Sequence, residues 1–145
     1  MKQKNLLLVL IVILIIIIIA VMVNKPDKKV APDVIDETEV IIYEFYGKGC
    51  PHCKHLNNWF DEIKPKYPNL KVVQYEVYSN NTNRALFQKV AKVYGTKAGG
   101  VPSIFIGEKN IVGFSPQVGG KIEAEILKCL EALCSSPLEK LDALE

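Results

Sequence analysis

The stretch VIIYEFYGKGCPHCKH, residues 40–55, places two cysteines at C-x-x-C spacing shortly after a run of β-branched and aromatic residues. Residues 40–46 are largely apolar on both alternating faces, which is typical of a central strand covered by helices on each side. After Gly-Lys-Gly, a helix is predicted from Pro51 to about Pro65. Its buried stripe is predicted to be Leu56, Phe60 and Ile63. The cysteine pair should therefore lie where a buried strand turns into a helix.

The rest of the chain continues this alternation of strands and helices. A second strand is predicted over residues 70–78, followed by a helix that ends at Gly95. Residues 103–107 and 111–114 should form a hairpin, after which Ser115 caps a final long helix. The predicted buried positions of the two later helices are Leu86, Val90, Val93 and Tyr94, and Ile122, Ile126, Leu130 and Leu133. This order predicts an α/β domain whose mixed sheet has helices on both faces.

The apolar run at residues 6–23 is long enough to cross a membrane, because as a helix it would span about 27 Å. A cleaved signal peptide has a shorter apolar region of about 7 to 15 residues, followed by small residues at the cleavage site. The sequence AVMVNKP at the end of this run lacks a small-x-small site. We therefore expect a single uncleaved transmembrane signal-anchor helix.

The orientation of this anchor is not decided by the positive-inside count, because lysines flank it on both sides. A short basic tail such as residues 1–5, placed before a long apolar run, usually stays inside. We therefore expect a single-pass membrane protein whose globular domain lies on the extracytoplasmic side.

Three further segments follow the anchor. Residues 24–37 are charged, contain two prolines and read as a flexible linker. The globular domain is predicted over residues 38–134, and residues 135–145 form a tail with a short helix. The net charge of +2 comes from lysines interleaved with acidic residues, which gives no indication of nucleic-acid binding.

Cysteines at C-x-x-C spacing serve either metal binding or redox exchange. A closed zinc site needs four ligands, but here only His52 and His55 accompany the pair and no second C-x-x-C exists in the chain. A thiol at the start of a helix faces unpaired N–H groups and the positive end of the helix dipole, which favour its thiolate. Cys50 occupies that position, and Cys53 follows one turn later. The position of the pair therefore favours redox exchange, and we expect neither a metal nor a cofactor.

Two residues between the cysteines are candidates for tuning the pair. Pro51 suits the first helical position because its missing N–H is not needed there. His52 can add positive charge or a hydrogen bond to the Cys50 thiolate, or it can be an exposed polar residue. A lower thiolate pKa stabilises the dithiol and makes the disulfide a stronger oxidant.

The motifs YEFYGKGCPHC and YGTKAGGVPSIFIG, together with the order of elements, resemble the thioredoxin-like superfamily. The C-P-H-C form, with Glu44 six residues before Cys50, is similar to DsbA-type extracytoplasmic disulfide oxidoreductases, and the short domain resembles membrane-tethered thioredoxins. The resemblance implies a membrane-anchored thiol–disulfide oxidoreductase. Its partners would be client proteins with cysteines and a membrane or soluble redox recycling partner.

The resemblance also implies roles for individual residues. Cys50 would attack and Cys53 would resolve the mixed disulfide. Pro102 would be the cis-proline beside the sulfurs, and Val101 would offer backbone hydrogen bonds to an extended substrate strand.

Glu44 is a carboxyl in an otherwise apolar strand, so we expect it to be desolvated. Desolvation would raise its pKa and suit it to relay a proton to or from Cys53. The alternative is an edge-exposed or salt-bridged residue.

Two departures from the resembled families leave the direction of electron flow open. The helical insertion of DsbA-type enzymes is absent, and Gly49 stands where thioredoxins usually carry tryptophan. The C-P-H-C motif and Val101 favour oxidation of clients, whereas the small domain favours reduction; isomerisation is the third possibility.

A second pair, Cys129 and Cys134, lies at the end of the last predicted helix. In an unbroken helix these two residues would be roughly 8 Å apart and rotated away from each other, too far for a disulfide. A bond requires the helix to end near Leu133, which the following Ser-Ser-Pro makes plausible. We favour a structural disulfide over free buried thiols or an electron relay.

The competing function is a thioredoxin-like module that binds copper or zinc, or that assembles a membrane complex without catalysis. Copper delivery would need methionine or histidine ligands near the pair. Met1 and Met22 both lie outside the predicted domain, which gives this function weak support.

Overall fold

The computed structural model describes residue 14 and residues 39–143. The predicted N-terminal tail at 1–5, the linker at 24–37 and, apart from residue 14, the anchor at 6–23 lie outside the described residues. Within the described part of the chain, no helix combines the length and apolar character needed to span a membrane.

The sheet is mixed, as the sequence predicts, with four strands in the order β2-β1-β3-β4. Strand β1 pairs in parallel with β2 and antiparallel with β3, and β3 pairs antiparallel with β4. The strands are β1 (Val40–Tyr46), β2 (Leu70–Glu76), β3 (Ser103–Ile106) and β4 (Lys109–Val112). The parallel strands β1 and β2 are joined by a helix and the antiparallel strands β3 and β4 by a turn, which confirms the predicted α/β class.

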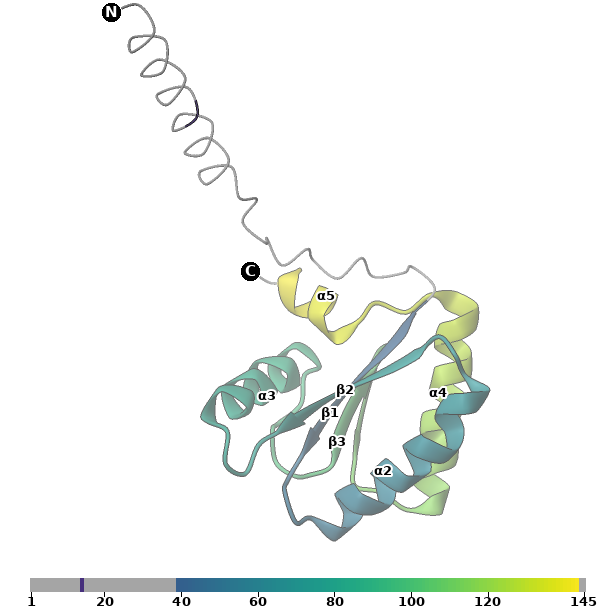
Figure 1. Ribbon diagram of the computed structural model, residues 1–145, viewed down its shortest axis with the longest axis horizontal. Coiled ribbons are helices and arrows are strands. Elements are labelled where there is room, and N and C mark those ends of the chain that lie inside the picture. The colour runs from purple at the N-terminus through teal and green to yellow at the C-terminus, as the bar shows by residue number, and fades with distance from the viewer. Residues whose placement is uncertain (1–13, 15–38, 144–145) are drawn as a thin grey trace, which may run out of the picture. The chain divides into compact units, whose positions relative to one another are not determined.

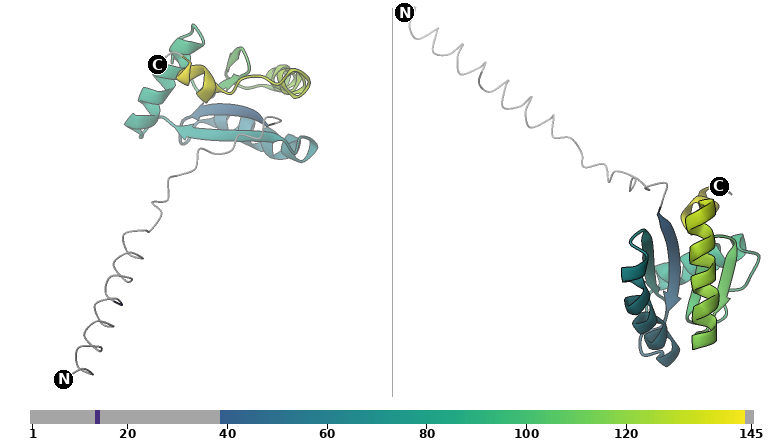
Figure 2. Two further views of the ribbon diagram at one scale, coloured as in Figure 1. Left: turned by 90° about the horizontal axis from the view of Figure 1, so that it is seen from above. Right: turned by 90° about the vertical axis from the view of Figure 1, so that its right-hand side faces the viewer.

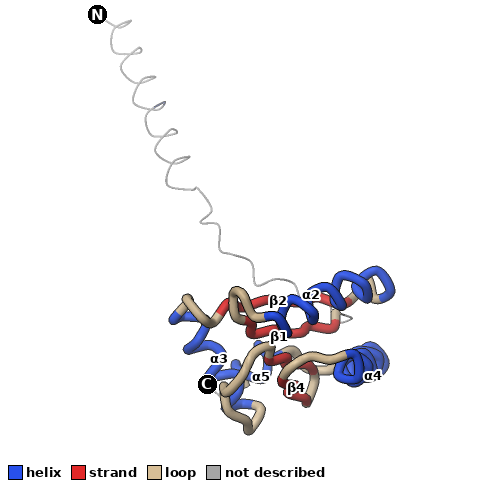
Figure 3. The backbone as a smooth tube through the Cα atoms, turned by 90° about the horizontal axis from the view of Figure 1, so that it is seen from below, coloured by secondary structure: helices blue, strands red, loops and turns tan. Residues whose placement is uncertain are grey.

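Helices cover both faces of the sheet (Figure 1, Figure 2). They are α2 (Pro51–Ile63), continued by a short 3-10 turn η1 (Lys64–Lys66), then α3 (Asn81–Val93), α4 (Pro116–Ala132) and α5 (Pro137–Asp142). Figure 3 shows α2 and α4 on one side of the strands and α3 and α5 on the other. The sheet is therefore the middle layer of three.

Strand β1 is buried on both faces because its alternate side chains enter two separate cores. Val40 and Ile42 pack with residues of α2 and α4. Tyr43 and Phe45 pack with residues of α3 and β3, and Leu141 of α5 covers that core. Because side chains alternate along a strand, the even positions of β1, including Glu44, face α2 and α4.

The core on the α3 side is built from aromatic rings. Phe45 stacks on Phe87 with ring centroids 4.6 Å apart and on Tyr75 at 5.2 Å. It also meets Phe105 edge-on at 5.6 Å. Such pairs add to the stabilisation from apolar burial and orient α3 against β1.

Three predicted features of the middle elements differ in the structure. Strand β2 ends at Glu76, two residues before the predicted end. Strand β4 begins at Lys109, so the hairpin turn consists of Gly107 and Glu108 only. Helix α3 buries Val90 as predicted, but its other buried residues are Phe87 and Ala91 rather than Leu86, Val93 and Tyr94. The larger Phe87 takes the sheet-facing position, which turns Leu86 and Val93 to half-buried positions.

The end of α4 also differs from the predicted stripe. Ile122 and Ile126 are buried as predicted, but Leu130 is half-buried and Leu133 is 61% exposed. The helix ends at Ala132, and Leu133 adopts a left-handed conformation with φ 49°. That reversal brings Cys134 back toward α4, where it forms a disulfide with Cys129 at a Cα–Cα distance of 4.8 Å.

The segment after Cys134 packs onto the domain. Helix α5 begins with a capping box in which Ser136 and Glu139 satisfy each other's backbone N–H groups. Leu141 then packs against the aromatic core between α3 and the sheet. The short helix predicted for the tail is present and covers one face of the sheet.

Gly107 gives a test of how tightly the second disulfide packs. A Cβ on Gly107 would lie 2.8 Å from Cys129 Sγ and 3.0 Å from Cys134 Sγ, whereas a Cβ on Gly113 would meet nothing within 4 Å. Both glycines have positive φ. We expect Gly113→Ala to cost about 1 kcal/mol of unfolding free energy from its backbone alone, and Gly107→Ala about 2 to 4 kcal/mol. Urea unfolding measures both values, and equal losses would contradict close packing at the disulfide.

Candidate active site

Cys50 is the N-cap of α2, and its extended backbone conformation ends the loop that leaves β1. Its Sγ accepts a hydrogen bond from the backbone N–H of Cys53 at 3.2 Å. Pro51 occupies the first helical position, as predicted. Gly49 precedes this cap with φ 85°, in the left-handed region that favours glycine. The loop is thereby shaped to present the first cysteine at the helix start.

The two cysteines form a disulfide with a Cα–Cα distance of 5.3 Å. Cys50 is half-buried, whereas Cys53 is 2% exposed. An incoming sulfur can therefore reach Cys50 but not Cys53. This asymmetry matches the attacking and resolving roles predicted for the pair.

Cys50 lies at the positive end of the α2 dipole, and no acidic side chain in the first turn of α2, which the structure describes completely, opposes that positive potential. When the disulfide is reduced, the positive end of the helix and the Cys53 N–H stabilise a thiolate at Cys50. His52 is exposed beside it, and its predicted tuning role stays a prediction.

A cis peptide bond joins Val101 to Pro102, as the resemblance implies. The Val101 carbonyl oxygen lies 3.9 Å from Cys50 Sγ. The loop before β3 therefore lies beside the cysteine pair, next to the end of the neighbouring strand β1. The loop is held by a hydrogen bond from Gly113 N–H to the Pro102 carbonyl at 2.8 Å and by one from Ser103 Oγ to the Gly100 carbonyl at 3.0 Å. Pro102 itself is buried.

Glu44 is fully buried, at 0% exposure, which excludes an edge-exposed position. Gln74 Nε2 donates to its Oε2 at 2.7 Å and also to Asn57 Oδ1 at 2.6 Å. Asn57 in turn lines the cavity that contains Cys50 and Cys53. Among residues 39–143, Glu44 Oε1 has no hydrogen-bond partner. The carboxyl is therefore linked to the site through one oxygen and has a second oxygen available for a proton.

Burial raises the pKa of Glu44 to about 7, although the hydrogen bond from Gln74 and the charge of Lys64 lower it. Desolvation disfavours the ionised carboxylate, because the buried group loses the water that would stabilise its charge. A carboxyl with a pKa near neutrality can both take up and release a proton at physiological pH.

Glu76 is a part of the site that sequence reasoning missed. Its Oε1 accepts hydrogen bonds from the backbone N–H groups of Lys48 and Tyr78, at 3.2 and 2.7 Å. Its Oε2 accepts from the Ser79 N–H at 3.0 Å and the Ser79 hydroxyl at 2.6 Å. These bonds, the Ser79 hydroxyl first, lower the pKa of Glu76 to about 2. Glu76 thus ties the loop before Cys50 to the β2–α3 connection.

No sequence pattern links Glu76 to Lys48, because the two lie 28 residues apart and meet only when β1 and β2 pair in register. Gln74 and Asn57 are also far apart in the sequence, and they meet only when α2 packs against the sheet. The sequence offered one signal for these contacts, the predicted parallel pairing of the first two strands. In the observed register this pairing places Glu44 beside Gln74 and Tyr46 beside Glu76.

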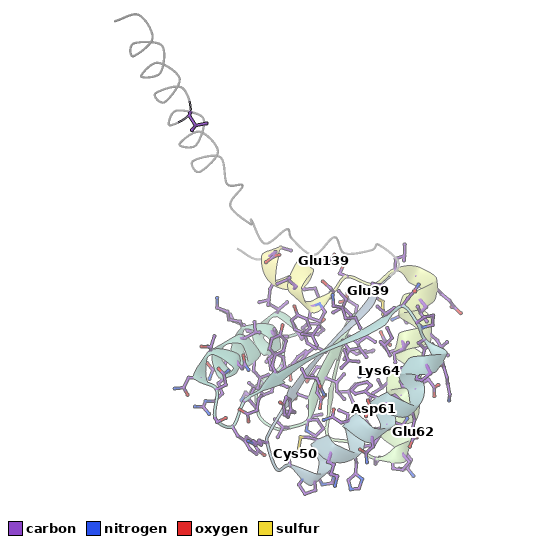
Figure 4. The ribbon with its side chains drawn as sticks, in the orientation of Figure 1. Glu39, Cys50, Asp61, Glu62, Lys64 and Glu139 are labelled. Atoms are coloured by element: carbon purple, nitrogen blue, oxygen red, sulfur yellow. A yellow bond between two sulfur atoms is a disulfide. The ribbon has the colours of Figure 1, made fainter. Side chains whose placement is uncertain are left out.

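Other sequence candidates lie apart from the cysteine pair. His55 lines a separate cavity with Trp59 and Phe114 between α2 and the start of α4. The Cys129–Cys134 disulfide lies near the end of α4, at the opposite end of the domain from Cys50, which Figure 4 labels at the turn into α2. Over the residues that the structure describes, no group of three or more His, Cys, Asp or Glu side chains is arranged to hold a metal ion.

Comparison with known proteins identifies a family. The family model described as Thioredoxin matches residues 21–131. No curated protein sequence matches the chain.

Several solved structures are similar to this chain at low sequence identity. A putative thiol:disulfide interchange protein DsbE from Chlorobium tepidum is 22% identical with a TM-score of 0.50, over 66% of this chain and 83% of that one. A periplasmic thioredoxin-like protein from Salmonella enterica serovar Typhimurium is 16% identical with a TM-score of 0.47, over 63% and 84%. The catalytic domain of Proteus mirabilis ScsC is 13% identical with a TM-score of 0.46, over 66% and 86%.

The raised pKa of Glu44 predicts a specific pH dependence of stability. A carboxyl whose folded pKa lies above its unfolded value stabilises the fold fully below the unfolded pKa, and this contribution is lost as pH rises through the folded pKa. The unsubstituted protein should therefore lose stability between pH 4 and pH 8, whereas Glu44→Gln has no carboxyl to titrate at this position. We expect the unfolding free energy of Glu44→Gln minus that of the unsubstituted protein to rise by about 3 kcal/mol over this range. Chemical denaturation of the disulfide form at several pH values measures this difference, since bonded cysteines do not titrate. A difference independent of pH would contradict the desolvation of Glu44.

Proposed function

This chain belongs to the thioredoxin family and is a thiol–disulfide oxidoreductase with a C-x-x-C pair. From that premise, we propose that it exchanges electrons with cysteines of client proteins outside the cytoplasm while it is anchored at a membrane. The observation that carries the proposal is the half-buried Cys50 at the start of α2, bonded to a buried Cys53 and contacted by the cis Val101–Pro102 loop.

The first step in the reducing direction is attack by the Cys50 thiolate on one sulfur of a client disulfide. The Cys50–client S–S bond forms as the client's own S–S bond breaks, and the second client sulfur leaves as a thiolate. The accessible position of Cys50 and the dipole of α2 favour this step.

The second step resolves the mixed disulfide. Cys53 loses its proton and attacks Cys50 Sγ, which restores the Cys50–Cys53 disulfide and releases the first client sulfur as a thiolate. Two electrons have then passed from the protein's dithiol to the client. Glu44 faces α2 from β1 with a pKa of about 7, which suits it to accept the proton of Cys53. The same steps in reverse oxidise a client dithiol.

Client binding is assigned to the loop before β3. An extended client segment beside Val101 can pair with its backbone as an added strand, which brings a client sulfur to Cys50. Backbone pairing does not depend on the client side chains, so this mode fits a broad set of substrates.

The proposed location rests on the sequence of residues 6–23 and the lysines around it. An anchored domain would act on clients close to the membrane surface. The recycling partner that restores the redox state of the pair would be either a membrane protein beside the anchor or a soluble thiol protein of the same compartment.

The Cys53→Ser variant tests the roles of the two cysteines. Without the resolving thiol, the mixed disulfide at Cys50 cannot be released, so we expect Cys50-linked client adducts that disappear on addition of reductant. The adducts are measured by non-reducing electrophoresis and mass spectrometry of the protein expressed in its own compartment. The Cys50→Ser variant is the matched control and should give none. Absence of adducts in Cys53→Ser would count against the proposed exchange.

The reduction potential of the Cys50–Cys53 couple distinguishes the two directions. Equilibration with glutathione buffers measures it. A value close to about −270 mV, as in thioredoxin, indicates a client reductase, whereas a value close to about −120 mV indicates an oxidase.

A further inference from the structure

A cavity of about 360 Å³ opens beside the cis-proline loop, on the side away from α2. One wall comes from the β2–α3 connection, through Val77 and Tyr78, and a second from α3, through Arg84 and Phe87. Val101 completes it from the loop before β3. The cavity therefore shares Val101 with the cysteine site, although Cys50 does not line it.

Arg84 is the cationic residue of this cavity, and its guanidinium is held in place by the protein. Nη1 donates to the carbonyl oxygens of Val77 at 2.9 Å and Tyr78 at 2.7 Å, and Nη2 donates to Asn81 Oδ1. These bonds use three of the five N–H groups of a guanidinium, which leaves two for an incoming acceptor. A guanidinium fixed in this way loses little freedom on binding a carboxylate.

Tyr78 connects the cavity to the loop that carries Cys50. Its ring lies directly over Gly47, where a Cβ would come within 2.3 Å of the ring atoms. The backbone of Tyr78 is held by Glu76, which also binds the backbone N–H of Lys48. The cavity wall and the active-site loop are thus parts of one hydrogen-bonded unit.

The charges around the two sites favour an anionic ligand. Lys48 and Lys54 line the cavity that contains Cys50, and Arg84 lines the neighbouring one. The nearby Glu76 is ionised, but its carboxylate already accepts four hydrogen bonds, so it does not compete with a ligand for the free N–H groups of Arg84. Complementary charge accelerates encounter and selects among partners.

Resting on the proposed function, we propose that this cavity is a client subsite that binds an Asp or Glu side chain close to the client cysteine, with Arg84 as the specificity-determining residue. The Val101 carbonyl oxygen is 3.9 Å from Cys50 Sγ, and Val101 also lines the cavity. Because Val101 is shared by the two sites, the acidic residue lies close in sequence to the client cysteine. Val77 and Phe87 contact the methylene groups of that side chain, and the guanidinium binds its carboxylate.

The experiment uses cysteine peptides whose thiol carries 2-nitro-5-thiobenzoate as a mixed disulfide. Attack of the reduced protein on the peptide sulfur releases the coloured thiolate, so kcat/KM follows from its absorbance. Peptide sets carry Glu, Gln or Lys at one position, scanned over three residues on each side of the cysteine. For the unsubstituted protein at low salt, we expect Glu to be about three- to tenfold better than Gln at one position, and Lys to be worse than Gln.

Two variants locate the source of this preference. Arg84→Gln should reduce the Glu-to-Gln ratio to about one, while Lys92→Gln should leave it unchanged. Lys92 is an exposed residue in the last turn of the same helix, so it alters the net charge equally. The ratio compares two peptides on one enzyme, so a general loss of stability in Arg84→Gln lowers both rates and leaves the ratio unaffected.

The outcomes separate the subsite from the proposed function. Equal rates for Glu, Gln and Lys peptides with the unsubstituted protein overturn the subsite without any variant. A Glu preference that Arg84→Gln retains, or that Lys92→Gln also removes, overturns the role of Arg84. Release of the coloured thiolate from none of the peptides overturns the proposed exchange itself.

Discussion

The burial of β1 on both faces is the constraint on which the rest of this structure depends. Apolar side chains on its two faces require a helix layer on each side, and the aromatic core around Phe45 accounts for the layer that contains α3 and α5. The same burial leaves Glu44 without water. Because β1 leads through Gly47–Gly49 directly into α2, the end of this buried strand also determines where Cys50 lies. Strand β1 therefore both organises the two cores and positions the residues of the redox site.

Two carboxylates near the cysteine pair differ in protonation because their surroundings differ. Glu44 is buried with a single donor, and desolvation raises its pKa to about 7. Glu76 accepts four hydrogen bonds near solvent, and its pKa falls to about 2. The first is suited to exchanging a proton during thiol–disulfide exchange. The second remains ionised and holds the loop before Cys50, so it acts on the geometry of the site rather than on its protons.

The loop around the cis Val101–Pro102 bond lies between two cavities of different chemistry. One contains the redox sulfurs, and the other is lined by Arg84 with apolar walls. A client strand beside Val101 would meet both, with its backbone on the loop and its side chains in either cavity. This arrangement offers a physical basis for a small domain to combine general recognition of extended segments with a preference for acidic ones. The second disulfide, at the other end of the domain, serves the junction between α4 and α5.

The sequence by itself determined the strand–helix order, the Cys50 cap and the starts of α2 and α4, and it indicated the desolvation of Glu44. These features follow from periodicity, capping residues and one acidic residue in an apolar strand, all of which are local. The hairpin turn, the sheet-facing side of α3 and the exposure of Leu133 were decided by packing, since the local pattern admitted more than one register. Only the tertiary structure brought Glu76 to Lys48, Gln74 to Asn57 and Arg84 to the cavity at Val101. These contacts join residues far apart in the chain, and they form only where strands pair and helices pack, which no local pattern encodes.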